Sequence, residues 1–164
     1  MRVIAWSAAL VLLVGVLAVL RSNALTPVRI SSSSMLPTLD PGDVVLVSLT
    51  TEPSDLARGD LVTFRSPEDG RSALKRVVGL PGDTVVVRDA VLYVNEQPVP
   101  EPHVDHARID GYYSRTYTVP PATFFVLGDN RGNSTDSRDY GPVPDDAMEG
   151  RVLVRAWPPR RARG

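Results

Sequence analysis

Short apolar runs separated by turn residues dominate the chain after residue 40 and limit the folds that it can adopt. The runs are a few residues long, rich in valine and bounded by Gly, Pro, Asp and Asn. Fifteen prolines and twelve glycines are spread over the 164 residues, and both residue types disfavour helix interiors. Apart from a short turn near residues 54–57, no useful helical periodicity follows residue 40. The pattern therefore predicts a mainly β domain.

The predicted strands are rich in β-branched and aromatic residues and lie between turn signals. Three Gly-Asp pairs, at residues 42–43, 59–60 and 82–83, are each expected to end a turn before a strand. Residues 95–123 contain several prolines and are expected to form a loop-rich excursion from the main sheet. The strand candidates are residues 44–47, 61–64, 77–78, 85–87, 91–94, 124–127 and 152–154.

Residues 3–20 form a run without charged side chains. As an α-helix this run would be about 27 Å long, close to the thickness of a bilayer's hydrocarbon core. A cleaved secretory signal ending at Ala24 is the alternative, but the run is longer than a usual signal core, and Arg21 follows it. We expect residues 1–21 to be an uncleaved membrane anchor and residues 22–164 to be one domain. Trimming after Ala24 stays open.

The charge distribution bears on partners and orientation. A net charge of −1 provides no electrostatic basis for binding nucleic acid, and no such partner is expected. Positive charges lie on both sides of the apolar run (Arg2 before it, Arg21 and Arg29 after it), so they do not decide its orientation. The tail after Arg151 contains several arginines and no acidic residue, and it could contact anionic lipid.

Four consecutive serines, residues 31–34, precede Met35. By composition alone, such a run is typical of a flexible polar linker. Apolar residues flank it closely, however, and Pro37 restricts the backbone just after it. A nucleophile held in a rigid turn is therefore the alternative.

Lys75 is the best available base for a serine nucleophile, because the chain has no cysteine and only two histidines. If its segment is a strand, Lys75 shares a face with Ala73 and Val77. Burial there would lower the pKa of Lys75 and allow its amine to accept a proton. A solvated strand lysine fits the local sequence equally well.

The two histidines, His103 and His106, could ligate a metal on one helical turn. Pro102 and the neighbouring Asp and Arg residues indicate an exposed loop instead, and no third ligand with suitable spacing is apparent. Residues 79–83 also lack the pattern of a phosphate-binding glycine loop. Neither a metal nor an organic cofactor is expected.

Three separated segments resemble motifs of the type I signal peptidases. Residues 32–38 resemble the nucleophile motif, residues 75–83 the motif that supplies a lysine base, and residues 128–138 the Gly-Asp-Asn-Arg motif. With the turns at residues 41–43 and 58–60, the match extends over residues 30–141 in the family's order. The resemblance implies a mainly β, signal-peptidase-like β-barrel or sheet domain with one N-terminal transmembrane helix.

Two positions depart from the family pattern: Ser33 replaces a glycine of some members, and Gly132 stands where aspartate is common. Neither position carries chemistry in the implied mechanism. The segment between Asp83 and Gly128 is short, as in the compact, singly anchored enzymes of Gram-positive bacteria.

The resemblance implies a membrane-bound serine endopeptidase that removes signal peptides from exported preproteins after small residues at −1 and −3. Ser34 would be the nucleophile and Lys75 the general base, with an acyl-enzyme intermediate. The Ser32 hydroxyl and the Ser34 backbone N–H would form the oxyanion hole, and Ser134 would orient Lys75. The remaining implied residues are the structural supports Asp129, Arg76, Asp136 and Arg138 and the pocket residues Ile30, Met35 and Leu39.

The implied protein is a monomer in the cell membrane, with one span, contacts to membrane lipid and an extracytoplasmic catalytic domain. Two other functions fit parts of the pattern. A self-cleaving repressor-type protease would share the Ser/Lys chemistry but would need a DNA-binding domain or a cleavable arm in the cytoplasm. The apolar run lies where such a domain would be. A catalytically inactive, anchored β module would not need the serines and the lysine together.

Overall fold

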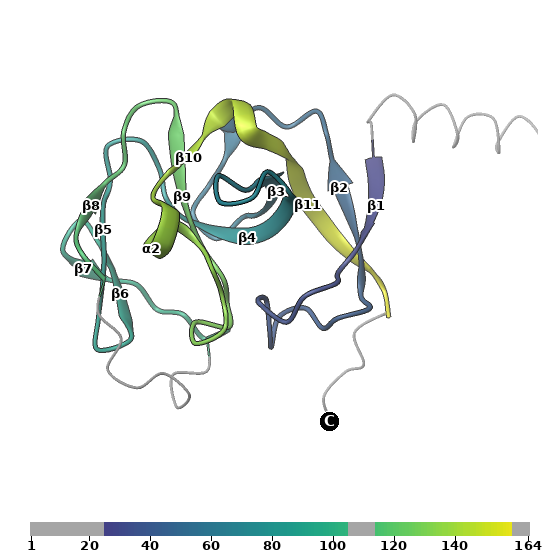
Figure 1. Ribbon diagram of the computed structural model, residues 1–164, viewed down its shortest axis with the longest axis horizontal. Helices are drawn as coiled ribbons and strands as arrows, with labels where there is room; N and C mark the ends of the chain where they lie inside the picture. Colours follow the sequence, from purple (N-terminus) through teal and green to yellow (C-terminus); the bar gives the residue numbers. More distant parts are fainter. Residues whose placement is uncertain (1–24, 105–113, 159–164) are drawn as a thin grey trace, which may run out of the picture.

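The computed structural model describes residues 25–104 and 114–158, which form two antiparallel sheets (Figure 1). The seven-stranded sheet has the order β1-β2-β11-β3-β4-β9-β10, and the four-stranded sheet has the order β7-β6-β5-β8. In the large sheet the strands are β1 Leu25–Arg29, β2 Val44–Ser48, β11 Met148–Trp157, β3 Leu61–Arg65, β4 Ser72–Gly79, β9 Thr123–Leu127 and β10 Val143–Pro144. In the small sheet they are β5 Thr84–Arg88, β6 Val91–Val94, β7 Gln97–Pro98 and β8 Tyr117–Thr118.

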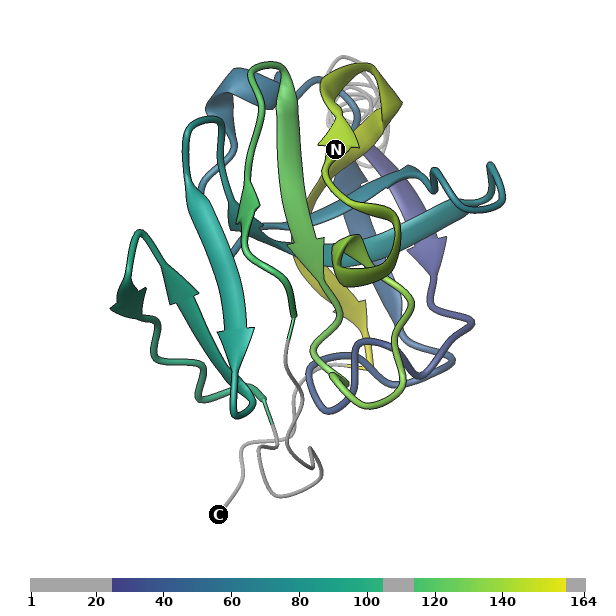
Figure 2. The same ribbon diagram turned by 60° about the vertical axis from the view of Figure 1, so that its left-hand side comes forward.

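Within the described ranges, only short helices interrupt the strands: η1 Pro53–Asp55, α2 Ser137–Tyr140 and η3 Asp145–Ala147. The large sheet is curled, and Figure 2 shows the small sheet beside it. Register shifts in β11, between Met148 and Gly150 and between Val152 and Val154, mark bulges that bend the sheet. The prediction of a mainly β domain is confirmed.

All seven strand candidates lie within observed strands, but two strands are longer than expected. β4 and β11 begin before the apolar residues 77–78 and 152–154 that indicated them. β1 was not predicted, because Pro27 interrupts its apolar pattern; Pro27 is tolerated there because β1 is an edge strand. β7, β8 and β10 have two residues each, too few to show a period.

The three Gly-Asp turns share one structure and precede β2, β3 and β5, as expected. Each glycine has a positive φ, +98°, +100° and +88° in chain order, which other residues rarely adopt. In each turn the aspartate carboxylate accepts a hydrogen bond from the N–H three residues earlier, at 2.8 to 2.9 Å. The repeated pair is therefore a structural turn motif.

Three clusters of buried apolar side chains form the core. One lies between the small sheet and β9, and a second packs Phe64 edge-on against Phe124 within the large sheet. The third cluster, Ile30, Met35, Leu39, Val45 and Val47, packs the segment after β1 against β2. That segment contains the serine run, so the third cluster determines where the serines lie.

The apolar run of residues 3–20, Ala24, His106 and the last arginines lie outside the described residues. Within residues 25–104 and 114–158, no helix is long and apolar enough to cross a membrane. The predicted excursion, residues 95–123, supplies β7 and β8 to the small sheet.

Candidate active site

The serine run forms an ordered turn between β1 and β2. Two backbone hydrogen bonds, from Ile30 N–H to Asp43 C=O and from Gly42 N–H to Ile30 C=O, close the segment at 2.8 Å each. Met35 and Leu39 are buried on its inner side, 1% and 3% exposed. The linker interpretation of the serines is therefore wrong, because both ends of the run are held by buried apolar neighbours.

Lys75 reaches Ser34 from β4. Its Nζ lies 2.7 Å from Ser34 Oγ, and each residue is only 7% exposed. Burial lowers the pKa of the Lys75 ammonium group, and the positive charge of Arg138 acts in the same direction, while the Asp136 carboxylate opposes it. The solvated strand lysine is thus excluded, and the pair has the geometry of a hydroxyl beside a potential base.

The Ser32 side chain lies beside the Ser34 hydroxyl group. Its Oγ is 3.2 Å from Ser34 Oγ, so the two hydroxyl groups converge on one position. A hydroxyl there could donate a hydrogen bond to negative charge that develops next to Ser34.

Ser134 differs from its expected role in one respect. Its buried Oγ has no hydrogen-bond partner, so the expected hydrogen bond to Lys75 is not formed in this structure. Ser134 nevertheless borders the same cleft as Ser34 and Lys75. An unpartnered buried hydroxyl costs free energy, which makes this position unusual for a purely structural serine.

Gly128 allows the chain around Ser134 to approach the nucleophile turn. A Cβ added at Gly128 would lie 2.7 Å from the Ser34 carbonyl oxygen and 2.5 Å from Ser134 Cβ. Both distances are shorter than a van der Waals contact, so only glycine fits without a shift of the backbone.

Two asparagines between Gly128 and Ser134 hold the nucleophile turn directly. Asn130 donates its N–H to the Ser34 carbonyl oxygen at 2.9 Å and its side-chain amide to the Ser33 carbonyl oxygen at 3.0 Å. The Asn133 amide donates to Ser33 Oγ at 3.0 Å. Sequence reasoning missed both, although their amides in a loop beside glycines were a signal for backbone contacts.

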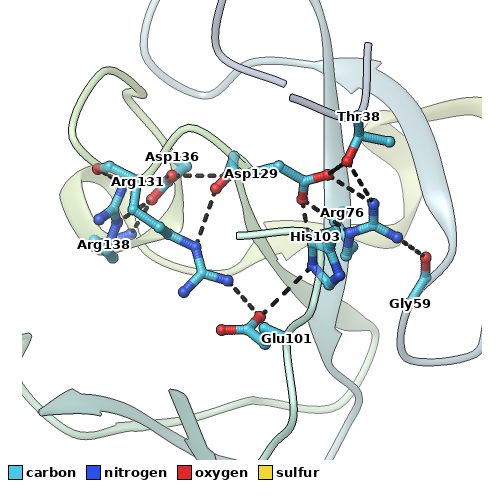
Figure 3. Close-up of polar contacts among 10 residues, drawn as sticks. Thr38, Gly59, Arg76, Glu101, His103, Asp129, Arg131, Asp136 and Arg138 are labelled. Carbon is cyan, nitrogen blue, oxygen red and sulfur yellow. Dashed lines mark hydrogen bonds and ion pairs between the residues drawn. The ribbon is translucent and has the colours of Figure 1, made fainter. Parts of the chain in front are cut away.

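Two buried ion pairs stabilise the surroundings, as Figure 3 shows. Arg138 donates to the fully buried Asp136 carboxylate at 2.7 and 2.8 Å, and Asp136 also accepts from Gly128 N–H at 2.9 Å. Arg76 donates to the Asp129 carboxylate at 2.9 and 2.7 Å. The structure therefore brings together the residue pairs named from the sequence.

His103 lies in a loop, as expected, but its side chain is less exposed than the sequence predicted. The side chain is 26% exposed, and its Nε2 lies 3.7 Å from Asp129 and 3.9 Å from Glu101 (Figure 3). The loop is drawn inward because Glu101 forms a buried ion pair with Arg131. Burial and the positive charge of Arg76 lower the pKa of His103. Neither Glu101 nor Arg131 was singled out from the sequence.

An open, mainly polar cleft contains the dyad. It is bordered by the serine turn, by the β3–β4 hairpin around residues 66–73 and by residues 133–135. Ile30, Met35 and Leu39 are not among its lining residues; they are packed in the third core cluster. Their role in substrate pockets stays a prediction. In the described part of the chain, no group of three or more His, Asp or Glu side chains could hold a metal ion.

Comparisons with known proteins bear on the family to which the chain is similar. The family model described as signal peptidase, peptidase S26, matches residues 3–157. Signal peptidase I of Bacillus caldolyticus is 35% identical over 156 residues, which cover 87% of this chain and 85% of that protein. Thylakoidal processing peptidase 1 of Arabidopsis thaliana is 37% identical over 153 residues, covering 86% of this chain and 44% of that protein. A crystal structure of a signal peptidase I from Enterococcus faecalis matches with a TM-score of 0.54 and 36% identity, over 61% of this chain and 97% of that one.

Proposed function

The chain belongs to the signal peptidase family, peptidase S26, and is a serine endopeptidase of the kind that cleaves signal peptides; from this premise we propose that Ser34 and Lys75 form its catalytic dyad. The substrates are exported preproteins with small residues at −1 and −3. The observation that carries the proposal is the 2.7 Å separation of Lys75 Nζ and Ser34 Oγ in buried surroundings. No cofactor takes part.

Acylation needs a neutral lysine. The Lys75 amine accepts the proton of the Ser34 hydroxyl while Oγ attacks the scissile carbonyl carbon. The C–N bond then breaks, and the proton passes from Lys75 to the leaving amine, which becomes the amino terminus of the mature protein. The signal peptide stays bound to Ser34 as an ester. The lowered pKa of Lys75 supports this role, because burial favours the neutral amine.

Deacylation uses the same base with water as the nucleophile. Lys75 accepts a proton from a water molecule as the water oxygen attacks the ester carbon. Ser34 Oγ then leaves and regains its proton from Lys75, which restores the dyad. In both steps the Ser32 hydroxyl and the Ser34 backbone N–H donate to the oxyanion.

The remaining residues position this dyad. Ser134 orients the Lys75 amine; in support, its buried Oγ has no other hydrogen-bond partner and Ser134 borders the same cleft as Lys75. The pairs Asp136–Arg138 and Asp129–Arg76 hold the loop that carries Ser134. Ile30, Met35 and Leu39 form the bases of shallow pockets for the −1 and −3 side chains.

The protein acts at the membrane as a monomer, with residues 1–21 as the anchor and residues 22–164 as the extracytoplasmic catalytic domain. Exposed apolar side chains on and beside neighbouring strands β2 and β11 support a lipid-facing surface. They are Leu49, Leu153, Val154 and Trp157.

The test is to incubate purified full-length protein in detergent with a preprotein that has alanine at −1 and −3. The product's amino terminus is then sequenced. Wild-type protein should release one mature terminus, and Ser34→Ala should release none. An inactive binding module would leave the preprotein intact with both proteins. A self-cleaving protease would shorten its own chain and leave the preprotein whole.

A further inference from the structure

The ion pair of Glu101 and Arg131 is a deeply buried charge pair that has no part in the proposed mechanism. Both side chains are 2% exposed, and Arg131 Nη2 donates to Glu101 Oε1. Glu101 follows β7 and lies outside all three sequence segments that carry the family resemblance. Glu101 therefore comes from the segment that supplies β7 to the small sheet, whereas Arg131 lies in the loop whose Asn130 N–H donates to the Ser34 carbonyl oxygen.

A contribution to folding stability is a weak explanation for the presence of this ion pair. Moving two charges from water into the protein interior carries a desolvation cost. This cost offsets most of the coulombic attraction of the pair unless every polar atom has a hydrogen-bond partner. Here Glu101 Oε2 and Arg131 Nη1 are buried without hydrogen-bond partners, and so is the neighbouring His103 Nε2. The geometry that the pair imposes is therefore the more informative property.

Arg131 transmits this geometry to the nucleophile turn. While Nη2 is held by Glu101, Arg131 Nε donates to the Gly128 carbonyl oxygen at 3.1 Å. The Arg131 carbonyl oxygen accepts from Arg138 at 2.9 Å, so both ends of the residue are fixed. The backbone between these points includes Asn130, whose N–H binds the Ser34 carbonyl oxygen.

We propose that Glu101 is a positioning residue for peptide cleavage: acting through Arg131, it holds the backbone of residues 128–130 against the carbonyl group of Ser34. The inference rests on the proposed function only in taking Ser34 as the nucleophile. A displacement of about 1 Å at a reacting atom can cost about 100-fold in rate. Release of this support should therefore slow the reaction without weakening substrate binding, because Glu101 does not border the cleft.

The test uses full-length protein in detergent micelles and replaces both charges by apolar residues of similar volume, Glu101→Leu with Arg131→Met. Such a replacement often preserves stability, and it removes the hydrogen bond to Gly128. Glu101→Gln is the conservative variant, because its amide oxygen can still accept from Arg131. Glu96→Gln is the matched control, since Glu96 is exposed in the same excursion.

In the double variant, kcat should fall about 10- to 100-fold while KM stays within about twofold of wild type. Glu101→Gln should lie between the double variant and wild type, and Glu96→Gln should match wild type. A wild-type kcat in the double variant, or a raised KM with unchanged kcat, would overturn the inference. If the double variant unfolds, Glu101→Gln decides, and a wild-type kcat for that folded variant overturns the inference.

Amide hydrogen exchange at Asn130 supplies a second measurement that needs no substrate. Exchange should be faster in the double variant than in wild type, and equal rates would contradict the positioning role. The proposed function and the positioning role of Glu101 can therefore be refuted separately. A wild-type protein that cleaves no preprotein refutes the proposed function, whereas unchanged exchange at Asn130 refutes the role of Glu101.

Discussion

Burial disfavours the charged form of Lys75. Lys75 extends from β4 toward Ser34, and the next residue on its face, Val77, is fully buried. Desolvation is the main cause of its lowered pKa, with Arg138 contributing and Asp136 opposing. A lysine in such surroundings can serve as a base, whereas an arginine stays protonated.

Replacing Lys75 by arginine should therefore abolish activity as completely as replacing it by alanine. We expect kcat/KM for preprotein cleavage to fall about 1,000-fold or more in both variants, since the charged guanidinium cannot accept the Ser34 proton. Arg71→Lys, a change at an exposed cation of the same cleft, is the control and should keep wild-type turnover. Substantial turnover by Lys75→Arg would make the lysine structural.

The pH dependence of activity follows from the lowered pKa of Lys75. A lowered pKa means that the neutral amine, the active form, becomes populated at a lower pH than for a free lysine. Activity should rise from acid toward mildly alkaline pH as Lys75 loses its proton. The measurement is kcat/KM against pH on a peptide substrate without titrating groups. A profile that is flat or falls over this interval would exclude a lysine base.

At the scale of elements, the loop of residues 128–134 and the serine turn form one unit. Gly128→Ala should separate them, because the added Cβ would meet the Ser34 carbonyl oxygen at 2.7 Å. We expect kcat to fall about 10- to 100-fold, with a loss of about 1–3 kcal/mol in the free energy of unfolding.

Gly150→Ala is the matched control for this change. Gly150 in β11 is crowded by the Ser48 carbonyl oxygen at 2.5 Å and Val47 Cγ1 at 2.6 Å, but it lies outside the cleft. It should lower Tm to a similar degree and leave kcat of the folded protein unchanged. Equal loss of kcat in both variants would mean that Gly128 acts through global stability.

The elements also differ in how well the sequence predicted them. Strands with several adjacent β-branched residues, such as β2 and β5, were predictable because packing reinforces their propensity. β1 was not predicted, because it contains Pro27, which is acceptable there only because β1 is an edge strand. The ion pairs Asp129–Arg76 and Asp136–Arg138 were expected from the family resemblance. The inward position of His103 depends on Glu101 and Arg131, which are thirty residues apart in sequence.

At the scale of the whole molecule, the cleft lies between the serine turn, the β3–β4 hairpin and residues 133–135. The core cluster under the serine turn leaves little free volume, because Met35 and Leu39 are nearly fully buried. A preprotein with alanine at −1 and −3 should be cleaved, whereas phenylalanine at −1 should lower kcat/KM about 100-fold or more. A ring would overpack these positions and displace the scissile carbonyl group from Ser34.

Peptides that differ only at −1 check this expectation, with phenylalanine at +2 as the control substitution. Similar kcat/KM for alanine and phenylalanine at −1 would remove the assignment of shallow pockets to Ile30, Met35 and Leu39.

The central claim is that Ser34 carries the signal peptide as an ester while Lys75 serves both steps. The most direct measurement is mass spectrometry of the full-length protein, quenched in acid during turnover of a preprotein and then digested. Wild-type protein should show the mass of the signal peptide on the fragment that contains Ser34, and Lys75→Arg and Ser34→Ala should show none. Cleavage of the preprotein by Ser34→Ala, or an ester on any other residue, would contradict the account.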